Sequence, residues 1–281
     1  PYRRQRQMCI RDRAYKVHPY RWPTIGLTPD HIREATLADV TAFYRRYYVP
    51  SNAILAVSGD IEPERVFELA DKWFGHLESV PAPADAFPQE PVQREARREE
   101  AYRDVPATQV TVALHMGGRR SPEYYCCDVM TDLLAGGTSA RLYNELVKRR
   151  RLFSAVNSYI TGDIDPGLFI LTGQLMPGVE LREGEEALWN QLERLCSEPV
   201  GDDELQKVRN KFEANMLYGE MNVMNKALNL AYYALLGELP LVNSELEIYR
   251  GVEAGQIMET ARRLFRRDRS STLVIYGKHG E

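Results

Sequence analysis

The chain has 281 residues, 44% hydrophobic and 10% aromatic, which is enough to bury one large or two ordinary cores. Its formal net charge of -4 excludes the positive field that nucleic-acid binding needs. No apolar run approaches the roughly 20 residues that span a bilayer, and the first residues lack the apolar core of a signal peptide.

Residues 1–13 differ from everything that follows. They are rich in arginine and glutamine and show no amphipathic period. We interpret them as a non-native or disordered segment and expect them to pack poorly. Burial of residues 8–10 would contradict this.

Residues 36–77 are predicted to form helix, strand and helix. Thr36 and Asp39 give a capping signature for the first helix, 53–58 is a short apolar run, and Pro63 opens the second helix. Both helices carry apolar faces that we expect to pack in a core, made of Val40, Phe43, Tyr44 and Tyr47 on the first and of Val66, Leu69, Ala70, Trp73, Phe74 and Leu77 on the second.

Four prolines within residues 81–92 mark a linker. We therefore expect a domain boundary there, with residues 14–80 in a first domain and 93–281 in a second. Residues 253–277 repeat weakly the helix and strand of the first domain, as two copies of one domain would near their C-terminal ends.

The second domain alternates strands and helices. We expect a charged edge strand in 94–102, a half-buried strand in 110–116, further strands in 153–161, 167–175 and 271–276, and helices in 122–134, 139–150, 183–196, 202–218, 224–236 and 254–265. Strands 153–161 and 167–175 should form an antiparallel hairpin. This order predicts an α+β fold, a mainly antiparallel sheet covered by helices.

The stretch from Gly136 to Tyr159 is the most informative part of the chain. Two glycines end the preceding helix, and Thr138 or Ser139 can cap the next. After Leu152 the apolar period drops from 3.6 to 2, which predicts a helix feeding a strand, with Phe153 and Ala155 on one face.

The cysteines and the basic clusters indicate ordinary structural roles. Cys126 and Cys127 are neighbours in a predicted helix and the sequence has no C-x-x-C motif, so we expect most cysteines to be buried small residues. The clusters 148–151 and 262–269 lie near predicted helix ends, where cations are favourable, and we expect them to be solvated.

Two stretches resemble a known family. Residues 136–147 read Gly-Gly-Thr-Ser-Ala-Arg-Leu-Tyr-Asn-Glu-Leu-Val, and residues 18–26 read His-Pro-Tyr-Arg-Trp-Pro-Thr-Ile-Gly, followed by the segment 43–60 ending in Ser-Gly-Asp. In this order they resemble the insulinase/pitrilysin-type zinc metallopeptidases, which include the mitochondrial processing peptidases. The resemblance implies the tail of a first peptidase-like domain in 14–80 and a nearly complete second copy in 93–281.

The resemblance implies a zinc motif, H-x-x-E-H, upstream of the segment that matches His18-Pro-Tyr. The five histidines of this chain include no pair four residues apart. We therefore expect no cofactor in this chain, zinc in the intact parent, and for His18 a hydrogen-bonded position in a loop.

In the family, the half without zinc presents an Arg and, seven residues on, a Tyr to the scissile bond. Val147 and Ser154 occupy those positions here. The departure resembles the zinc-bearing chain of two-subunit members, whose sister subunit supplies Arg and Tyr. Arg149 or Arg150 could replace the missing arginine after a register shift, although solvation at the surface is the simpler interpretation.

Ser139 and Arg141 are the candidate substrate-binding residues, at the start of the central helix. The alternative is that they only cap and solvate that helix.

The resemblance implies the C-terminal portion of a zinc metalloendopeptidase that hydrolyses extended peptides, itself inactive without H-x-x-E-H. The alternative is a non-catalytic scaffold or partner subunit. The sequence leaves open whether the parent is an enzyme and whether its compartment is the bacterial periplasm or the cytoplasm.

Overall fold

The computed structural model describes residues 10–24, 26, 28–78, 80–81 and 86–277. The chain divides into two compact units. Unit 1 contains residues 1–22, 88–212 and 247–281, and unit 2 contains residues 23–87 and 213–246. One division falls between Phe87 and Pro88, inside the predicted linker. The assignment of 14–80 and 93–281 to two copies of one domain stays a prediction.

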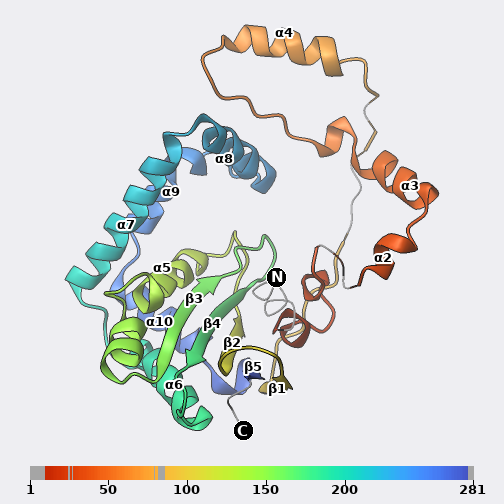
Figure 1. The fold of residues 1–281 in the computed structure, drawn as a ribbon. Coiled ribbons are helices and arrows are strands. Elements are labelled where there is room, and N and C mark those ends of the chain that lie inside the picture. The colour runs from red at the N-terminus through yellow and green to blue at the C-terminus, as the bar shows by residue number, and fades with distance from the viewer. Residues whose placement is uncertain (1–9, 25, 27, 79, 82–85, 278–281) are drawn as a thin grey trace. The chain divides into compact units, whose positions relative to one another are not determined.

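Unit 1 is built on a five-stranded sheet of order β1-β5-β2-β4-β3 (Figure 1). All its pairings are antiparallel except that of β1 with β5, which is parallel. The strands are β1 (Arg97–Tyr102), β2 (Gln109–His115), β3 (Phe153–Ile160), β4 (Leu168–Leu175) and β5 (Ser270–Tyr276). The predicted α+β class, the charged edge strand and the β3–β4 hairpin are confirmed.

Helices cover one face of this sheet. Phe169 of β4 makes an edge-to-face ring contact with Phe265, which ends α10, and α10 in turn packs against α5 and α6. The helices of the second half are α5 (Tyr124–Ala135), η3 (Tyr143–Arg149), α6 (Leu181–Ser197), α7 (Asp202–Glu220), α8 (Val223–Leu236), α9 (Leu241–Arg250), α10 (Ala254–Leu264) and the short η4 (Arg267–Arg269). Every predicted helix here is present, whereas α9 was not predicted.

The opposite face of the sheet is also covered. Ala113 of β2, Leu168 and Ile170 of β4, and Leu273 and Ile275 of β5 form a buried cluster with Ile10, Ala14 and Tyr15. Strand β2 is therefore buried on both faces along nearly its whole length. The prediction of a half-buried strand is wrong because the covering residues come from a distant part of the sequence.

The prediction that residues 1–13 pack poorly is wrong for the last residues of that segment. Residues 10–14 form a helical turn and the side chain of Ile10 is fully buried. Burying the apolar side chain of Ile10 beside Tyr15 lowers the free energy of the folded chain, whether or not the segment is native. Residues 1–9 lie outside the described residues, and the non-native origin of the segment stays a prediction.

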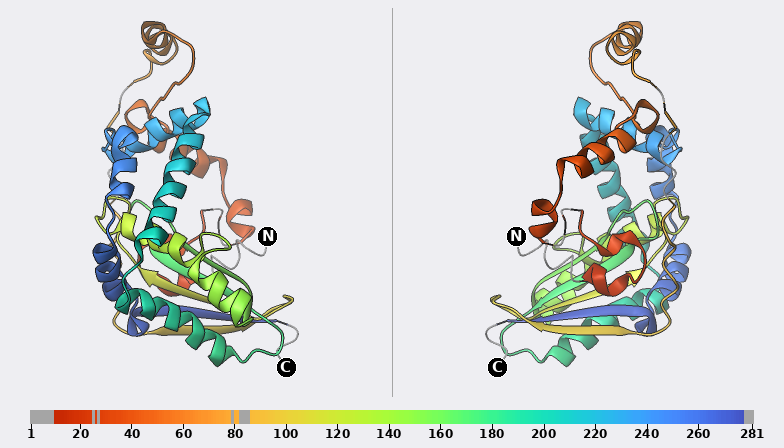
Figure 2. Two further views of the ribbon diagram at one scale, coloured as in Figure 1. Left: turned by 90° about the vertical axis from the view of Figure 1, so that its left-hand side faces the viewer. Right: turned by 90° about the vertical axis from the view of Figure 1, so that its right-hand side faces the viewer.

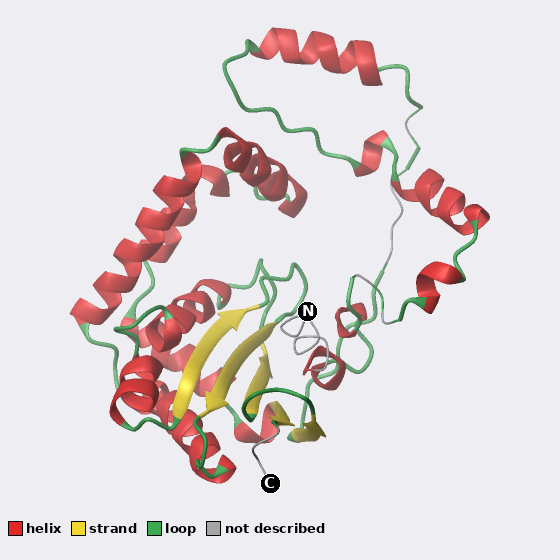
Figure 3. Cartoon of the chain, in the orientation of Figure 1, coloured by secondary structure: helices red, strands yellow, loops and turns green. Residues whose placement is uncertain are grey.

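Unit 2 begins with short helices joined by extended chain (Figure 3). Its first segment, residues 23–87, contains α2 (Asp30–Arg33), α3 (Leu37–Tyr47), η2 (Pro50–Asn52) and α4 (Pro63–Phe74). The short helix η1 (Pro19–Arg21) precedes this segment and belongs to unit 1. The predicted capping box is confirmed, because Asp39 N donates to Thr36 Oγ1 at 3.2 Å and Thr36 N donates to Asp39 Oδ2 at 3.0 Å.

The strand predicted for residues 53–58 is not formed. These residues are drawn as loop in Figure 3, and Ile54, Leu55 and Val57 are exposed. A strand is defined by hydrogen bonds to a neighbour, and an apolar run alone does not supply one.

The predicted core packing of the two helix faces is also wrong for the described chain. Phe43 on α3 is 57% exposed and Trp73 on α4 is 61% exposed. Because no strand forms between them, these helices have no sheet of their own to cover. The helical spacing of the apolar residues identified the helices correctly but not their burial.

The two neighbouring cysteines have the structural role that the sequence predicted. Cys126 and Cys127 are buried in α5, and burial raises the pKa of both thiols, as expected for structural cysteines. Among the described residues, no helix has the length and apolar character of a membrane span.

Candidate functional site

A glycine turn connects α5 to the helix that follows. Gly136 ends α5, and its N–H donates to the carbonyl of Asp132 at 2.8 Å. Gly137 has φ 137°, a value that residues with a side chain rarely adopt. The turn therefore depends on glycine, as the sequence predicted.

Replacing Gly137 with alanine tests this turn. No atom lies within 4 Å of an added Cβ, so the cost comes from the backbone alone and should be about 1–3 kcal/mol of unfolding free energy. Urea unfolding measures it. Gly255→Ala is the matched control, since that added Cβ also meets nothing but lies in helix α10, where alanine is favoured. Equal effects of the two substitutions would contradict the argument.

The predicted helix over 139–150 is confirmed in kind, but it begins at Arg141 and most of it is π-helical. Arg150 N donates to Glu145 O at 2.9 Å, five residues back. Leu142 and Leu146 are fully buried, as their spacing predicted. π-Helical turns are rare and occur frequently at functional sites, so this segment is a candidate on geometry as well as on sequence.

The connection from this helix to β3 is irregular. Arg151 has φ 52°, the left-handed conformation, and the pairing of β3 with β4 shifts between Phe153 and Ala155. Phe153 is buried whereas Ala155 is exposed. The prediction that both side chains share a face is wrong, because the bulge interrupts the alternation.

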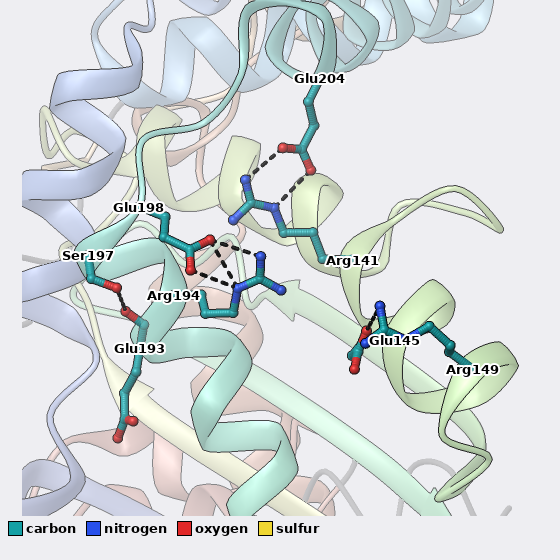
Figure 4. Close-up of polar contacts among 8 residues, drawn as sticks. All are labelled: Arg141, Glu145, Arg149, Glu193, Arg194, Ser197, Glu198 and Glu204. Atoms are coloured by element: carbon teal, nitrogen blue, oxygen red, sulfur yellow. Dashed lines mark hydrogen bonds and ion pairs between the residues drawn. The ribbon is translucent and has the colours of Figure 1, made fainter.

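The structure brings both predicted site residues, Ser139 and Arg141, against helix α7. Arg141 donates through Nε and Nη2 to the two carboxylate oxygens of Glu204, at 2.9 and 2.6 Å. Lys207 Nζ donates to Ser139 Oγ at 3.2 Å. The pair of Arg141 and Glu204 is largely buried, with side chains 15% and 24% exposed. Figure 4 shows it.

Lys211, one helical turn further along α7, binds the same turn. Its Nζ donates to Asp132 Oδ1 at 2.8 Å and to Gly136 O at 2.9 Å. Sequence reasoning missed Glu204, Lys207 and Lys211. Their spacing of three and four residues, which places them on one face of a helix, is the signal that could have grouped them.

Further ion pairs surround this contact (Figure 4). Arg194 donates to Glu198, and Arg149 pairs with Glu145 at 3.1 Å. The hydrogen bond to Glu198 raises the pKa of Arg194, and the same bond lowers the pKa of Glu198. Both of these pairs lie four residues apart, within η3 and at the end of α6, so the contacts of this unit with α7 are those of Arg141 and Ser139.

The two positions where the family pattern has Arg and Tyr are unremarkable in their contacts. Val147 is half-buried in η3, and Ser154 is exposed in the bulge, where its Oγ donates to Gln174 O at 3.2 Å. Of the possible replacements, Arg149 is 78% exposed and Arg150 contacts Glu183 at 3.3 Å. The simpler interpretation of these two arginines, solvation at the surface, agrees with this.

Histidine is the commonest metal ligand among protein side chains. Within the described part of the chain, no three His, Cys, Asp or Glu side chains are grouped so as to hold a metal ion. His18 is 4% exposed, and its Nδ1 accepts a hydrogen bond from Tyr20 N at 3.2 Å. The prediction of a hydrogen-bonded loop histidine is confirmed.

A family model described as the peptidase M16 inactive domain matches residues 34–212. The chain therefore belongs to the M16 peptidase family, and the match is to the domain that this model describes as inactive. The match begins within the predicted tail of the first domain and ends in α7.

Two proteins of similar sequence are a protease and a peptidase subunit by name. A zinc protease, PqqE, of Helicobacter pylori is 27% identical over 265 residues, which are 93% of this chain and 60% of that protein. A probable mitochondrial-processing peptidase subunit beta of Schizosaccharomyces pombe is 28% identical over 170 residues, 56% of this chain and 36% of that protein.

A solved structure gives the same result. The crystal structure of a protease from Helicobacter pylori superposes with a TM-score of 0.86 at 26% identity, covering 96% of this chain and 66% of that one. The chain thus spans about 60% of the length of its PqqE relative, and the suspected family is confirmed.

Proposed function

We propose that this chain is the non-catalytic portion of a zinc metalloendopeptidase that hydrolyses extended peptides. The match to the M16 inactive domain supports the non-catalytic portion. The names of the similar proteins, a zinc protease and a processing peptidase subunit, support the activity of the whole protein. Zinc would be bound by an H-x-x-E-H motif, which the sequence of this chain does not contain.

The proposal includes a sister subunit. The observation that carries it is the identity of residues 147 and 154. A valine side chain cannot stabilise negative charge, and a serine hydroxyl does not extend as far from the backbone as a tyrosine hydroxyl. Neither Val147 nor Ser154 could therefore act on a scissile carbonyl as Arg and Tyr would. A partner chain of the same family would supply both groups.

Ser139 and Arg141 are proposed to contact the peptide. Ser139 is exposed. The Nη1 atom of Arg141 is buried and has no hydrogen-bond partner among the described residues, although Nε and Nη2 are engaged by Glu204. The exposed Ser139 hydroxyl suits a carbonyl group of an extended peptide, whereas the buried Arg141 Nη1 would reach the peptide only if the guanidinium moved away from Glu204.

The test uses the full-length gene product, alone and mixed with a second chain of the same family from the same genome. We expect stoichiometric zinc in the product and peptidase activity in the mixture about 100-fold above that of either chain, the usual effect of supplying groups that stabilise the transition state. Equal activity of the single chain and the mixture would refute the pairing.

The second candidate function is a scaffold subunit without catalysis. The match to a domain described as inactive favours it as well. The upstream coding sequence distinguishes the two functions, because only the peptidase requires H-x-x-E-H there. Zinc content of the purified full-length product gives the same answer independently.

A further inference from the structure

The chain crosses from unit 1 to unit 2 after Trp22 and returns at Pro88. The residues just inside unit 1 at these two crossings are bonded to each other. The Glu90 carboxylate accepts three backbone hydrogen bonds, from Lys16 N at 2.7 Å, Val17 N at 2.9 Å and His18 N at 3.0 Å. The two passages are therefore joined at one place.

The residues before the first crossing, 14–22, form a segment that we call the strap. Ala14 and Tyr15 are each 1% exposed, in the cluster that covers the second face of the sheet. His115 Nε2 lies 2.8 Å from Ala14 O, and Tyr15 Oη donates to Pro166 O at 3.0 Å. The start of the strap is thus fixed to β2 and to the β3–β4 connection.

The middle of the strap has a second attachment to that connection. Because His18 Nδ1 accepts from Tyr20 N, the ring proton of neutral His18 lies on Nε2, which is 3.5 Å from Asp165 Oδ2. Asp165 N donates to Tyr20 Oη at 3.3 Å. The rings of His18 and Tyr20 meet edge to face with centroids 4.3 Å apart.

The contact made by Glu90 differs from the others because an ionised carboxylate accepts its hydrogen bonds. Burial alone would raise its pKa, but the three backbone donors together outweigh burial, and its pKa lies below the ordinary value. Hydrogen bonds to an ionised acceptor are shorter and stronger than neutral ones. A neutral amide at this position would keep only one acceptor oxygen for three donors.

We propose that the strap and Glu90 form a neck, in which the Glu90 carboxylate is the clasp. The two ends of residues 23–87 are then attached to unit 1 through one tether and not through two independent linkers, while residues 213–246, the other part of unit 2, continue from unit 1 through α7 and α9. The clasp closes a loop of more than 60 residues, so its loss would release chain freedom at both crossings. The neck does not depend on the proposed peptidase function.

Hydrogen exchange tests the clasp. In Glu90→Gln we expect the amides of residues 16–18 to exchange about tenfold faster or more, while β4 keeps its protection. Glu95→Gln is the matched control, because Glu95 is an exposed residue with the same charge change five positions away. Exchange in Glu90→Gln equal to that in the wild type would overturn the proposal.

Spin labels at residues 24 and 87, just outside the two crossings, test the single tether. Their distance distribution should broaden in Glu90→Gln and stay unchanged in Glu95→Gln, and equal widths would overturn the tether. If Glu90→Gln unfolds unit 1, Val17→Pro removes one donor and keeps the carboxylate, with Val17→Ala retaining the donor. Faster exchange at residues 16 and 18 in Val17→Pro alone supports the neck, and equal exchange overturns it.

Discussion

Replacing Phe153 with alanine is expected to lower the free energy of unfolding by about 3–5 kcal/mol. The side chain is 1% exposed and lies where β4 and α6 approach each other. A Cβ added at Gly173 would be 2.4 Å from Phe153 Cε1, and one added at Gly184 would be 3.2 Å from its Cζ. The ring therefore fills a space bounded by two glycine backbones. These cannot move inward easily, so the substitution leaves a cavity.

Urea unfolding followed by circular dichroism measures this effect. Phe67→Ala is the matched control, the same substitution at a side chain on α4 that is 72% exposed, and it should change stability by less than about 0.5 kcal/mol. Adding Gly173→Ala should recover part of the loss caused by Phe153→Ala, since the three atoms nearest to a Cβ added there all belong to Phe153 and the new methyl group occupies the vacated space. A cost for Phe153→Ala no larger than that of Phe67→Ala would contradict the packing.

Local patterns predicted the elements of unit 1 well. The β3–β4 hairpin follows from an alternating run and a mostly apolar run on either side of a turn with glycine at both ends, and the edge position of β1 follows from its charges. Burial was harder to predict, because it depends on segments far away in the sequence. β2 is covered by residues 10–15, and α3 and α4 remain exposed although their apolar residues have helical spacing.

Irregular features had no signal in the periodicity. The π-helical turn and the bulge after Phe153 depend on how neighbouring elements fit together. Helix α9 was missed although Val242, Leu246 and Tyr249 have helical spacing. The candidate site shows the same limit. Ser139 and Arg141 could be named from their position after the glycine turn, but their partners Glu204 and Lys207 lie more than 60 residues later. Only the folded chain reveals that α7 holds the turn.

Replacing Glu204 with glutamine is expected to lower the free energy of unfolding by about 2–3 kcal/mol. Breaking a buried ion pair typically costs about 3–5 kcal/mol, and the partial exposure of this pair reduces that range. The cost arises because the Arg141 guanidinium stays charged and largely buried, and its Nη1 already has no partner among the described residues. Replacing Arg141 with methionine and Glu204 with leucine together should recover most of the stability, since no charge is then left unpaired.

Glu247→Gln is the matched control for this prediction. Its pair with Arg250 has the same 2.6 Å separation as the pair of Arg141 with Glu204, but its side chains are 68% and 42% exposed. Water and salt screen such a pair, so the change should stay below about 0.5 kcal/mol and vanish in high salt. The cost of Glu204→Gln should persist in salt, because buried charges are screened much less. A cost of Glu204→Gln that disappears in 1 M salt, like that of Glu247→Gln, would show that Arg141 is solvated and that α7 does not lock the glycine turn.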